Sequence, residues 1–442
     1  MLGWAACVAS ALAVAGPREN VKEVAVLVND YYFDAQRAVT IAADLRRDAD
    51  EGAFDRFADP DDLAVELTRR LKILDAHFNV IWEGEANRAS SVPASAASAS
   101  TTRSATGSQP APREMQPVAP ADFEAVDRRA SYGFRRVERL PGNIGYIELA
   151  YAANIDFADR DSPARRVADG ALALVRGADA IILDLRQNGG GSPAMVGYLV
   201  SAFVAPGKNV YNIFHSRSGI ESERPDIVYA DPMLTVPLYV LTSARTASAA
   251  EAIAYTLQTC GRAKVVGERS AGAANPGMMF RTPQGFAIFV STGSPRNPLN
   301  DRNWEGDGVR PDLETSETRA LARAQVLALE GVLSGPIAGF ERVDAQWALD
   351  ALRASVQSYS PGRLSTYVGT YGPFAITVAS GVLEAKRGRQ PPLALVPLQR
   401  DVFYVSGEPS RRFAFIRTND RVVALEVRRS RGDGQHFNRI RR

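Results

Sequence analysis

The chain has 442 residues, which is too long for one ordinary hydrophobic core and predicts two or three domains. Hydrophobic residues make up 45% of it and charged residues 23%, values typical of a globular protein. Its 52 Lys and Arg side chains nearly balance 50 Asp and Glu side chains, and a net charge of +2 gives no reason to expect nucleic-acid binding.

Residues 1–16 form an apolar, alanine-rich stretch that ends in Ala-Val-Ala-Gly. An apolar run before small residues is typical of a secretory signal peptide, although the basic start is missing, and an apolar N-terminal helix is the alternative. The stretch is too short to span a bilayer. We therefore expect a periplasmic or secreted protein with no stable membrane span. Cys7 would leave with the signal, and Cys260 alone cannot form an internal disulfide.

Residues 17–85 are predicted to form an N-terminal helical region. Apolar residues recur there at helical spacing from Glu19 to Leu74, and residues 78–82 are typical of a short strand. Residues 86–120 consist mainly of Ala, Ser, Thr and Pro without periodicity, a composition that buries too little apolar surface to offset ordering. We expect this segment to be a disordered linker.

Residues 121–335 alternate between strand-like and helix-like patterns, which predicts an α/β (α+β) core. The expected strands are 144–149, 180–185, 238–242, 263–266 and 287–290, and the expected helices are 164–175, 194–203, 249–258 and 317–333.

The C-terminal quarter of the chain has a different pattern. A connecting helix is expected at 345–359, within a segment bounded by 336 and 360. Residues 361–430 contain short alternating runs separated by Gly, Asn or Pro, which predicts a small all-β domain. Arginines concentrate in residues 431–442, where we expect a solvated basic tail.

Ser248 stands between an apolar strand and a predicted helix, in the run Thr-Ser-Ala-Arg-Thr-Ala-Ser-Ala-Ala-Glu. A hydroxyl at that place lies beside the unpaired N–H groups of a helix N-terminus, which suits a nucleophile. The N–H of Ala249 would then face the oxyanion that forms when Ser248 attacks a carbonyl. The alternative is a capping box, in which Ser248 and Glu251 only satisfy helix donors.

A second informative segment is Ile-Ile-Leu-Asp-Leu-Arg-Gln-Asn-Gly-Gly-Gly-Ser-Pro, residues 181–193. Consecutive glycines let the backbone approach a ligand closely and present N–H groups to a negative oxygen. A plain strand-to-helix turn or a phosphate loop is the alternative. The spacing matches neither the dinucleotide nor the P-loop pattern, so phosphate binding is not expected.

Together, in this order, the two segments resemble those of the tail-specific or C-terminal-processing serine proteases, a family that includes the tricorn protease core and the interphotoreceptor retinoid-binding proteins. The resemblance covers roughly residues 24–333. It implies a core resembling the ClpP and crotonase fold, with Ser248 as nucleophile and the amides of Gly190 and Ala249 as the oxyanion hole. It also implies a peptide or protein substrate and neither a metal nor another cofactor.

One departure from that family concerns the base. The processing proteases carry a lysine after the nucleophile, whereas the corresponding run here, residues 267–276, has Ala273 at that place. Alanine cannot take a proton. Lys264 lies in a predicted strand and Arg269 stays protonated, so neither is a convincing substitute.

The base is therefore expected to be one of three histidines, His77, His215 or His436. His436 lies in the basic tail and His215 on a predicted strand edge. His77, in the run Leu-Asp-Ala-His-Phe, resembles the histidine of the tricorn-like branch. We therefore predict that His77 is the general base.

A histidine base needs an acceptor that orients its second nitrogen. The run Asn-Trp-Glu-Gly-Asp-Gly, which contains Glu305, resembles the segment that supplies a glutamate in the tricorn-like branch. Asp307 and Asp75 are the rival candidates. The alternative for Glu305 is an exposed loop carboxylate beside a glycine turn.

These inferences predict a serine peptidase that works through an acyl-enzyme. The alternatives are a non-catalytic binder of lipophilic ligands, which the retinoid-binding relatives permit, and an interaction protein whose β domain binds partners. The processing proteases commonly carry a PDZ domain, but the region between His77 and Ile144 is mainly low-complexity, which puts recognition of substrate C-termini in doubt. The sequence leaves the oligomeric state open.

Overall fold

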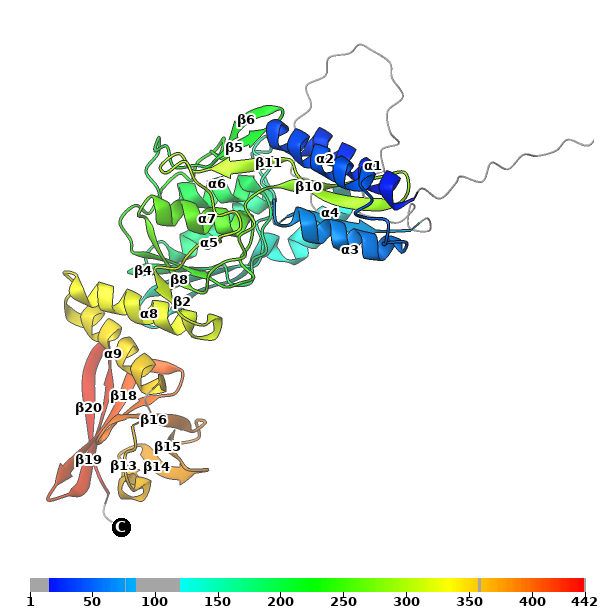
Figure 1. Cartoon of the computed structure of the whole chain (residues 1–442). Helices are drawn as coiled ribbons and strands as arrows, with labels where there is room; N and C mark the ends of the chain where they lie inside the picture. The colour runs from blue at the N-terminus through cyan, green and yellow to red at the C-terminus, as the bar shows by residue number, and fades with distance from the viewer. Residues whose placement is uncertain (1–15, 76, 85–119, 357–358, 441–442) are drawn as a thin grey trace, which may run out of the picture.

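The computed structural model describes residues 16–75, 77–84, 120–356 and 359–440 (Figure 1). The expected signal peptide and linker lie outside these residues, apart from Gly16 and Pro120. Within the described ranges, no helix combines the length and apolar character needed to cross a membrane. The molecule is a mixed α/β protein with a separate antiparallel sheet at its C-terminal end.

A six-stranded sheet forms the centre, in the order β12-β8-β7-β4-β3-β2. All neighbouring pairs are parallel except β2 with β3. All residues of β4 and β7 are buried, as expected for parallel strands covered on both faces. The strands are β2 (Phe134–Leu140), β3 (Ile144–Leu149), β4 (Ala180–Asp184), β7 (Leu238–Thr242), β8 (Ala263–Gly267) and β12 (Leu313–Glu314).

Helices cover both faces of this sheet. Alternate residues of β4 point to opposite faces and pack against different helices. Ile181 and Leu183 pack in one hydrophobic core, with helices α5, α6 and α7. Ile182 packs in another core on the opposite face, with α8 and α9. The helices are α5 (Pro163–Val175), α6 (Pro193–Ser201), α7 (Ala249–Thr259), α8 (Glu317–Ser334) and α9 (Gly339–Val356).

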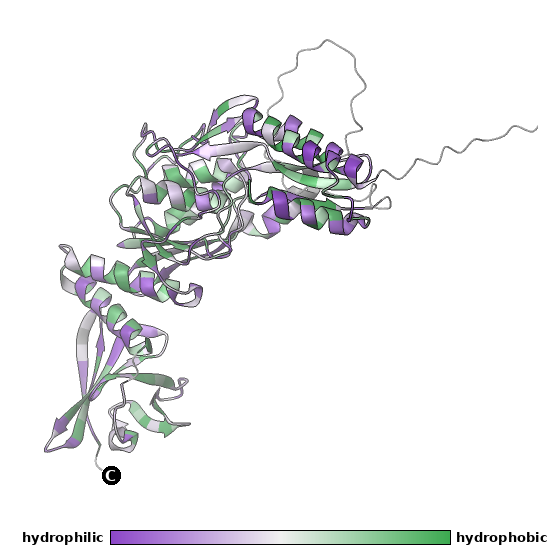
Figure 2. Ribbon diagram, in the orientation of Figure 1, coloured by the Kyte–Doolittle hydropathy of each residue, from purple (hydrophilic) through white to green (hydrophobic). Residues whose placement is uncertain are grey.

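The N-terminal helices pack on a second, three-stranded sheet with the order β1-β10-β9 (Figures 1 and 2). Asp34 and Asp59 accept backbone N–H bonds at the starts of α2 and α3. The helical region therefore shares its core with strands more than 200 residues later in the chain. The elements are α1 (Pro17–Tyr31), α2 (Ala35–Asp50), α3 (Pro60–Leu71), β1 (Asn79–Trp82), β9 (Gly277–Arg281) and β10 (Phe286–Ser291).

Several short elements were not predicted from the sequence, apart from a strand at His215. One is a small antiparallel sheet in the order β11-β5-β6, and another is a helix that precedes β2. They are α4 (Pro120–Arg129), β5 (Ile213–Ser216), β6 (Gly219–Ser222) and β11 (Gly293–Arg296).

The C-terminal part is an eight-stranded antiparallel sheet in which each strand pairs with the next. The Ile440 N–H donates to Thr370 O (2.8 Å), which brings the end of the last strand back to the first and nearly closes a barrel. β20 occupies most of the segment expected to be a solvated basic tail. The strands are β13 (Gly369–Tyr371), β14 (Phe374–Ala379), β15 (Val382–Arg387), β16 (Leu393–Gln399), β17 (Val402–Val405), β18 (Glu408–Thr418), β19 (Arg421–Arg429) and β20 (Gly432–Asn438).

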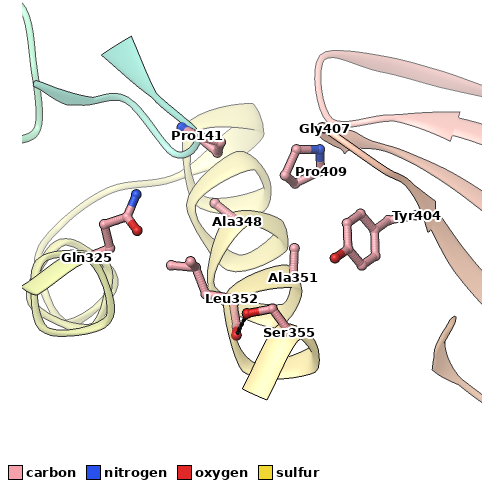
Figure 3. Close-up of a pocket in the computed structure, with 9 residues that line it drawn as sticks. All are labelled: Pro141, Gln325, Ala348, Ala351, Leu352, Ser355, Tyr404, Gly407 and Pro409. Carbon is pink, nitrogen blue, oxygen red and sulfur yellow. Dashed lines mark hydrogen bonds between the residues drawn. The ribbon is translucent and has the colours of Figure 1, made fainter. Parts of the chain in front are cut away.

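Helix α9 joins this sheet to the central domain. Arg412 donates to Asp350 Oδ2 (2.7 Å) and lies 4.3 Å from the centre of the Trp347 ring. A cavity of about 180 Å³ between α9 and the sheet is lined by residues such as Leu352 and Tyr404 (Figure 3). None of the site residues predicted from the sequence lines this cavity.

Candidate active site

Ser248 lies on the turn between β7 and α7. Its backbone has φ +52° and ψ −120°, a conformation that costs free energy for a residue with a side chain. Ser248 is exposed, and Ala249 is the first residue of α7. The hydroxyl-bearing residue therefore immediately precedes a helix N-terminus whose first N–H groups have no partner within the helix.

The glycine loop after β4 lies against this turn. A Cβ built on Gly190, which has φ +127°, would be 2.8 Å from Ser248 Cβ and 3.2 Å from Ser248 Oγ, so only glycine fits there. The Gly190 N–H donates to Asn188 Oδ1 (2.8 Å), while the Ala247 N–H donates to Asn188 O (3.1 Å). The structure therefore brings Gly190 to Ser248, with the Gly190 amide already engaged by Asn188.

Glu251 is fully buried in the first turn of α7 and accepts four hydrogen bonds. One comes from the Ser248 N–H (2.8 Å), which is the glutamate half of the predicted capping box. The others come from the Ser270 hydroxyl (2.5 Å), the Gly272 N–H (2.7 Å) and the Ala273 N–H (2.8 Å). Burial raises the pKa of the Glu251 carboxyl, and these donors oppose that shift. Glu251 thus ties the serine turn to the loop at 270–273.

His77 and Glu305 meet across 228 positions of sequence. His77 Nδ1 is 2.9 Å from Glu305 Oε1 and 3.4 Å from Asp75 Oδ1, and the His77 backbone N–H donates to Asp75 Oδ1 (2.9 Å). Burial alone would lower the pKa of His77, but hydrogen bonds and charges from Asp75 and Glu305 outweigh it and raise the pKa to about 9. Two carboxylates therefore hold this imidazole.

The loop at 272–275 connects the two halves of the site. Glu305 Oε2 accepts the N–H groups of Ala274 (2.9 Å) and Asn275 (3.0 Å). The two preceding amides, those of Gly272 and Ala273, go to Glu251. Four consecutive backbone amides are thus shared between a carboxylate at the Ser248 turn and a carboxylate at His77. Ala273, at the place of the family lysine, contributes a backbone N–H to this bridge.

Residues 143–315 match the model of peptidase family S41. The chain resembles this family over these residues, which make up less than half of its length. It is 28% identical over 183 residues to the carboxyl-terminal-processing peptidase 1, chloroplastic, of Arabidopsis thaliana, a match that covers 41% of this chain and 36% of the relative. It is 32% identical over 137 residues to the carboxyl-terminal-processing protease of Picosynechococcus sp., covering 31% of this chain and 32% of the relative.

These matches span about a third of the length of either relative. Among solved structures, the photosystem II D1 C-terminal processing protease is 24% identical, with a TM-score of 0.33 and a match that covers 47% of each chain. Because that overlap is low, the likeness to the S41 family rests on the sequence matches, which confirm the resemblance inferred from residues 181–193 and 242–251.

The other ionisable candidates are placed differently. Lys264 is exposed on β8, and Asp307 is exposed, 3.9 Å from Arg310. His215 lies on β5 opposite Ser294, and His436 lies on β20. Asp75, His77 and Glu305 offer ligand atoms within 4.8 Å of one another, a set that could hold a metal ion. Their hydrogen bonds also suit proton transfer, which requires no ion.

We expect Glu251→Gln to destabilise the central domain by about 1–3 kcal/mol. An amide nitrogen in place of either oxygen would face two donors and leave them unpaired in the core. Urea unfolding measures this loss. Glu268→Gln is the matched control, because Glu268 accepts a single backbone amide, that of Glu317, and should lose less. Equal stability of Glu251→Gln and the unmodified chain would contradict the role of Glu251 in holding the serine turn to the loop at 270–273.

Proposed function

We propose that this chain is a serine peptidase that hydrolyses peptide bonds of peptides or proteins through an acyl-enzyme on Ser248. The observation that carries the proposal is the His77–Glu305 pair, at 2.9 Å, connected through the amides of residues 272–275 to the turn that carries Ser248. This geometry and the family match favour catalysis over a non-catalytic binder of lipophilic ligands.

In the proposed reaction, Ser248 Oγ attacks the peptide carbonyl and His77 Nε2 takes the hydroxyl proton. His77 then gives that proton to the leaving amine, and a water molecule, deprotonated by His77, hydrolyses the ester on Ser248. Glu305, on Nδ1, holds the ring in the tautomer that leaves Nε2 free to accept. Among the described residues no hydrogen bond joins Ser248 Oγ to His77, so the two must approach when substrate binds, as is common in ligand-free enzymes.

The amides of Ala249 and Gly190 are the proposed oxyanion hole. The Ala249 N–H, at the start of α7, has no acceptor among the described residues and supports this role. The Gly190 N–H already donates to Asn188 Oδ1. An oxyanion must therefore compete with Asn188 for the Gly190 amide.

We also propose that the core has the ClpP and crotonase fold and that the chain is exported. The glycine loop and the serine turn follow β4 and β7, which are neighbours in the parallel sheet, so both segments reach the same sheet edge. The proposal of export rests on the composition of residues 1–16.

Incubation of the purified chain with an internally quenched peptide library tests the proposed function, with products identified by mass spectrometry. Cleaved peptides are expected. Complete absence of cleavage, with a folded chain, would contradict the proposal.

Glu305→Gln is expected to lower kcat/KM by about 10- to 150-fold, which corresponds to about 1.5–3 kcal/mol for a hydrogen bond to a charged group. Loss of the charge should also lower the pKa of His77 and shift the pH profile of kcat/KM downward. Asp307→Asn is the matched control, because that neighbouring carboxylate is exposed and does not contact His77. Equal kcat/KM values for Glu305→Gln and Asp307→Asn would show that Glu305 does not orient His77 in the reaction.

A further inference from the structure

Strand β9 begins two residues after Asn275, whose N–H donates to Glu305, and it forms one edge of the β1-β10-β9 sheet. The backbone hydrogen bonds at the two ends of β9 show which of its residues pair with β10. The Thr292 N–H donates to Pro276 O, and the Thr282 N–H donates to Phe286 O, both at 2.8 Å.

Hydrogen-bonded pairs in an antiparallel ladder recur at every second residue. Between these two ends, Met278 and Phe280 therefore direct their backbone groups toward β10. Gly277, Met279 and Arg281 direct their N–H and C=O groups to the free edge. No other described strand pairs with this edge. These three alternate residues therefore offer backbone N–H and C=O groups for pairing with a further strand, beside the proposed catalytic groups.

The side chains of the outward residues share the sheet face that carries Phe289. Met279 is opposite Phe289 in a non-hydrogen-bonded pair, the kind in which side chains approach most closely. The Phe289 ring lies 6.1 Å from the His77 ring, centroid to centroid. A Cβ on Gly277 would be 2.5 Å from Phe289 Cε1, so glycine at 277 makes room for this ring.

The opposite face of the same sheet is the one that packs on the N-terminal helices. Val80, Ile288 and Val290 are buried there, and Phe280 stacks on Tyr31 at 3.9 Å. Phe289 and Met279 remain partly exposed on the other face. Two apolar side chains therefore form an accessible apolar shelf, defined as Met279 and Phe289, immediately beside the proposed base.

We propose that β9 is the docking strand for substrate: an extended peptide pairs antiparallel with the outward N–H and C=O of Met279 and places an apolar side chain on the Met279–Phe289 shelf. Adding a strand to an exposed edge supplies backbone hydrogen bonds, and the shelf supplies selectivity. This proposal rests on the proposed peptidase function and names the class of peptide that the site takes.

The first test compares Met279→Ala with Met278→Ala. Both residues lie on β9, but Met278 points to the opposite face, where its side chain is 54% exposed. The substrates are internally quenched peptides of one backbone, with Leu or Asp placed at each position in turn. The unmodified chain should prefer Leu at one position. Met279→Ala should lower kcat/KM for that peptide about tenfold, whereas Met278→Ala should leave it within about twofold.

The second test is Met279→Pro, which removes one outward N–H without breaking the β9–β10 ladder, because proline is tolerated on the open side of an edge strand. KM should rise for the Leu peptide. Labelling of Ser248 by a small fluorophosphonate, which does not use the strand edge, should proceed at the unmodified rate in both Met279 variants.

The outcomes separate this proposal from the peptidase proposal. Normal peptide kinetics in both Met279 variants, with peptides still cleaved, would overturn the docking strand and leave the peptidase intact. Failure of every variant and of the unmodified chain to cleave peptides would overturn the peptidase proposal itself. A loss of fluorophosphonate labelling in Met279→Ala would show that Met279 supports the catalytic groups rather than substrate, and would also overturn the docking proposal.

Discussion

Ser248→Ala is expected to abolish peptide hydrolysis while the chain stays folded, because alanine removes the only atom that attacks the carbonyl. The Glu251 carboxylate accepts the backbone N–H of residue 248, a bond that alanine keeps. The stability cost should therefore not exceed the loss of a helix cap, about 1 kcal/mol. Turnover of a quenched peptide and the midpoint of urea unfolding measure the two effects.

Ser316→Ala is the matched control for this variant. Ser316 is also the residue before a helix, α8, but its hydroxyl pairs with that of Thr318 (3.2 Å) and not with a residue of the proposed site. It should keep full turnover. Residual hydrolysis in Ser248→Ala above that of the peptide in buffer would assign Ser248 to helix capping and move the nucleophile elsewhere.

His77→Ala is expected to reduce turnover by about 100-fold or more, the usual scale for loss of a general base. The base must be neutral to accept the Ser248 proton. With a pKa of about 9, about 1% of His77 is neutral at pH 7, so kcat/KM of the unmodified chain should rise about tenfold per pH unit from 7 and level off above 9.

The raised pKa of His77 also determines how the stability of the folded chain should change with pH. Because the pKa of His77 is raised in the folded chain, its contribution to stability is complete below pH 6.5 and is lost as the pH rises through about 9. Activity at His77 and stability from His77 should therefore change in opposite directions over this range. His436→Ala, at an exposed position on β20, is the control and should alter neither profile. Near-normal turnover in folded His77→Ala would falsify the proposed base.

The central strands and the turn that carries Ser248 could be predicted because their signals are local. β4 and β7 are short apolar runs followed by turn residues, and such runs form buried parallel strands. Strands β5, β6 and β9 belong to small three-stranded sheets, contain only exposed or half-buried residues and show no clear period of two. The segment of β20 was predicted to be a solvated tail because arginines concentrate there, yet pairing with β19 holds it in the sheet.

Only the contact of Glu251 with the Ser248 turn could be predicted from the sequence. The Ser-Ala-Ala-Glu spacing indicates a capping box, and the Ser248 N–H bond agrees with it. Glu251 also accepts the backbone amides of Gly272 and Ala273, about 20 residues later in the chain. Backbone donors cannot be identified from residue types alone. Likewise, periodicity predicted the N-terminal helices but not their shared core with β10, because tertiary packing decides which strands a helix face covers.

The most direct test of the proposed serine–histidine–glutamate site is to react the chain with a fluorophosphonate across pH 6–10 and to map the adduct by peptide mass spectrometry. We expect a single adduct on Ser248, formed at a rate that rises with pH to about 9 and that is lower in Glu305→Gln and lower still in His77→Ala. An adduct on another residue, or a rate on Ser248 that does not change in His77→Ala, would contradict the proposed serine–histidine–glutamate site.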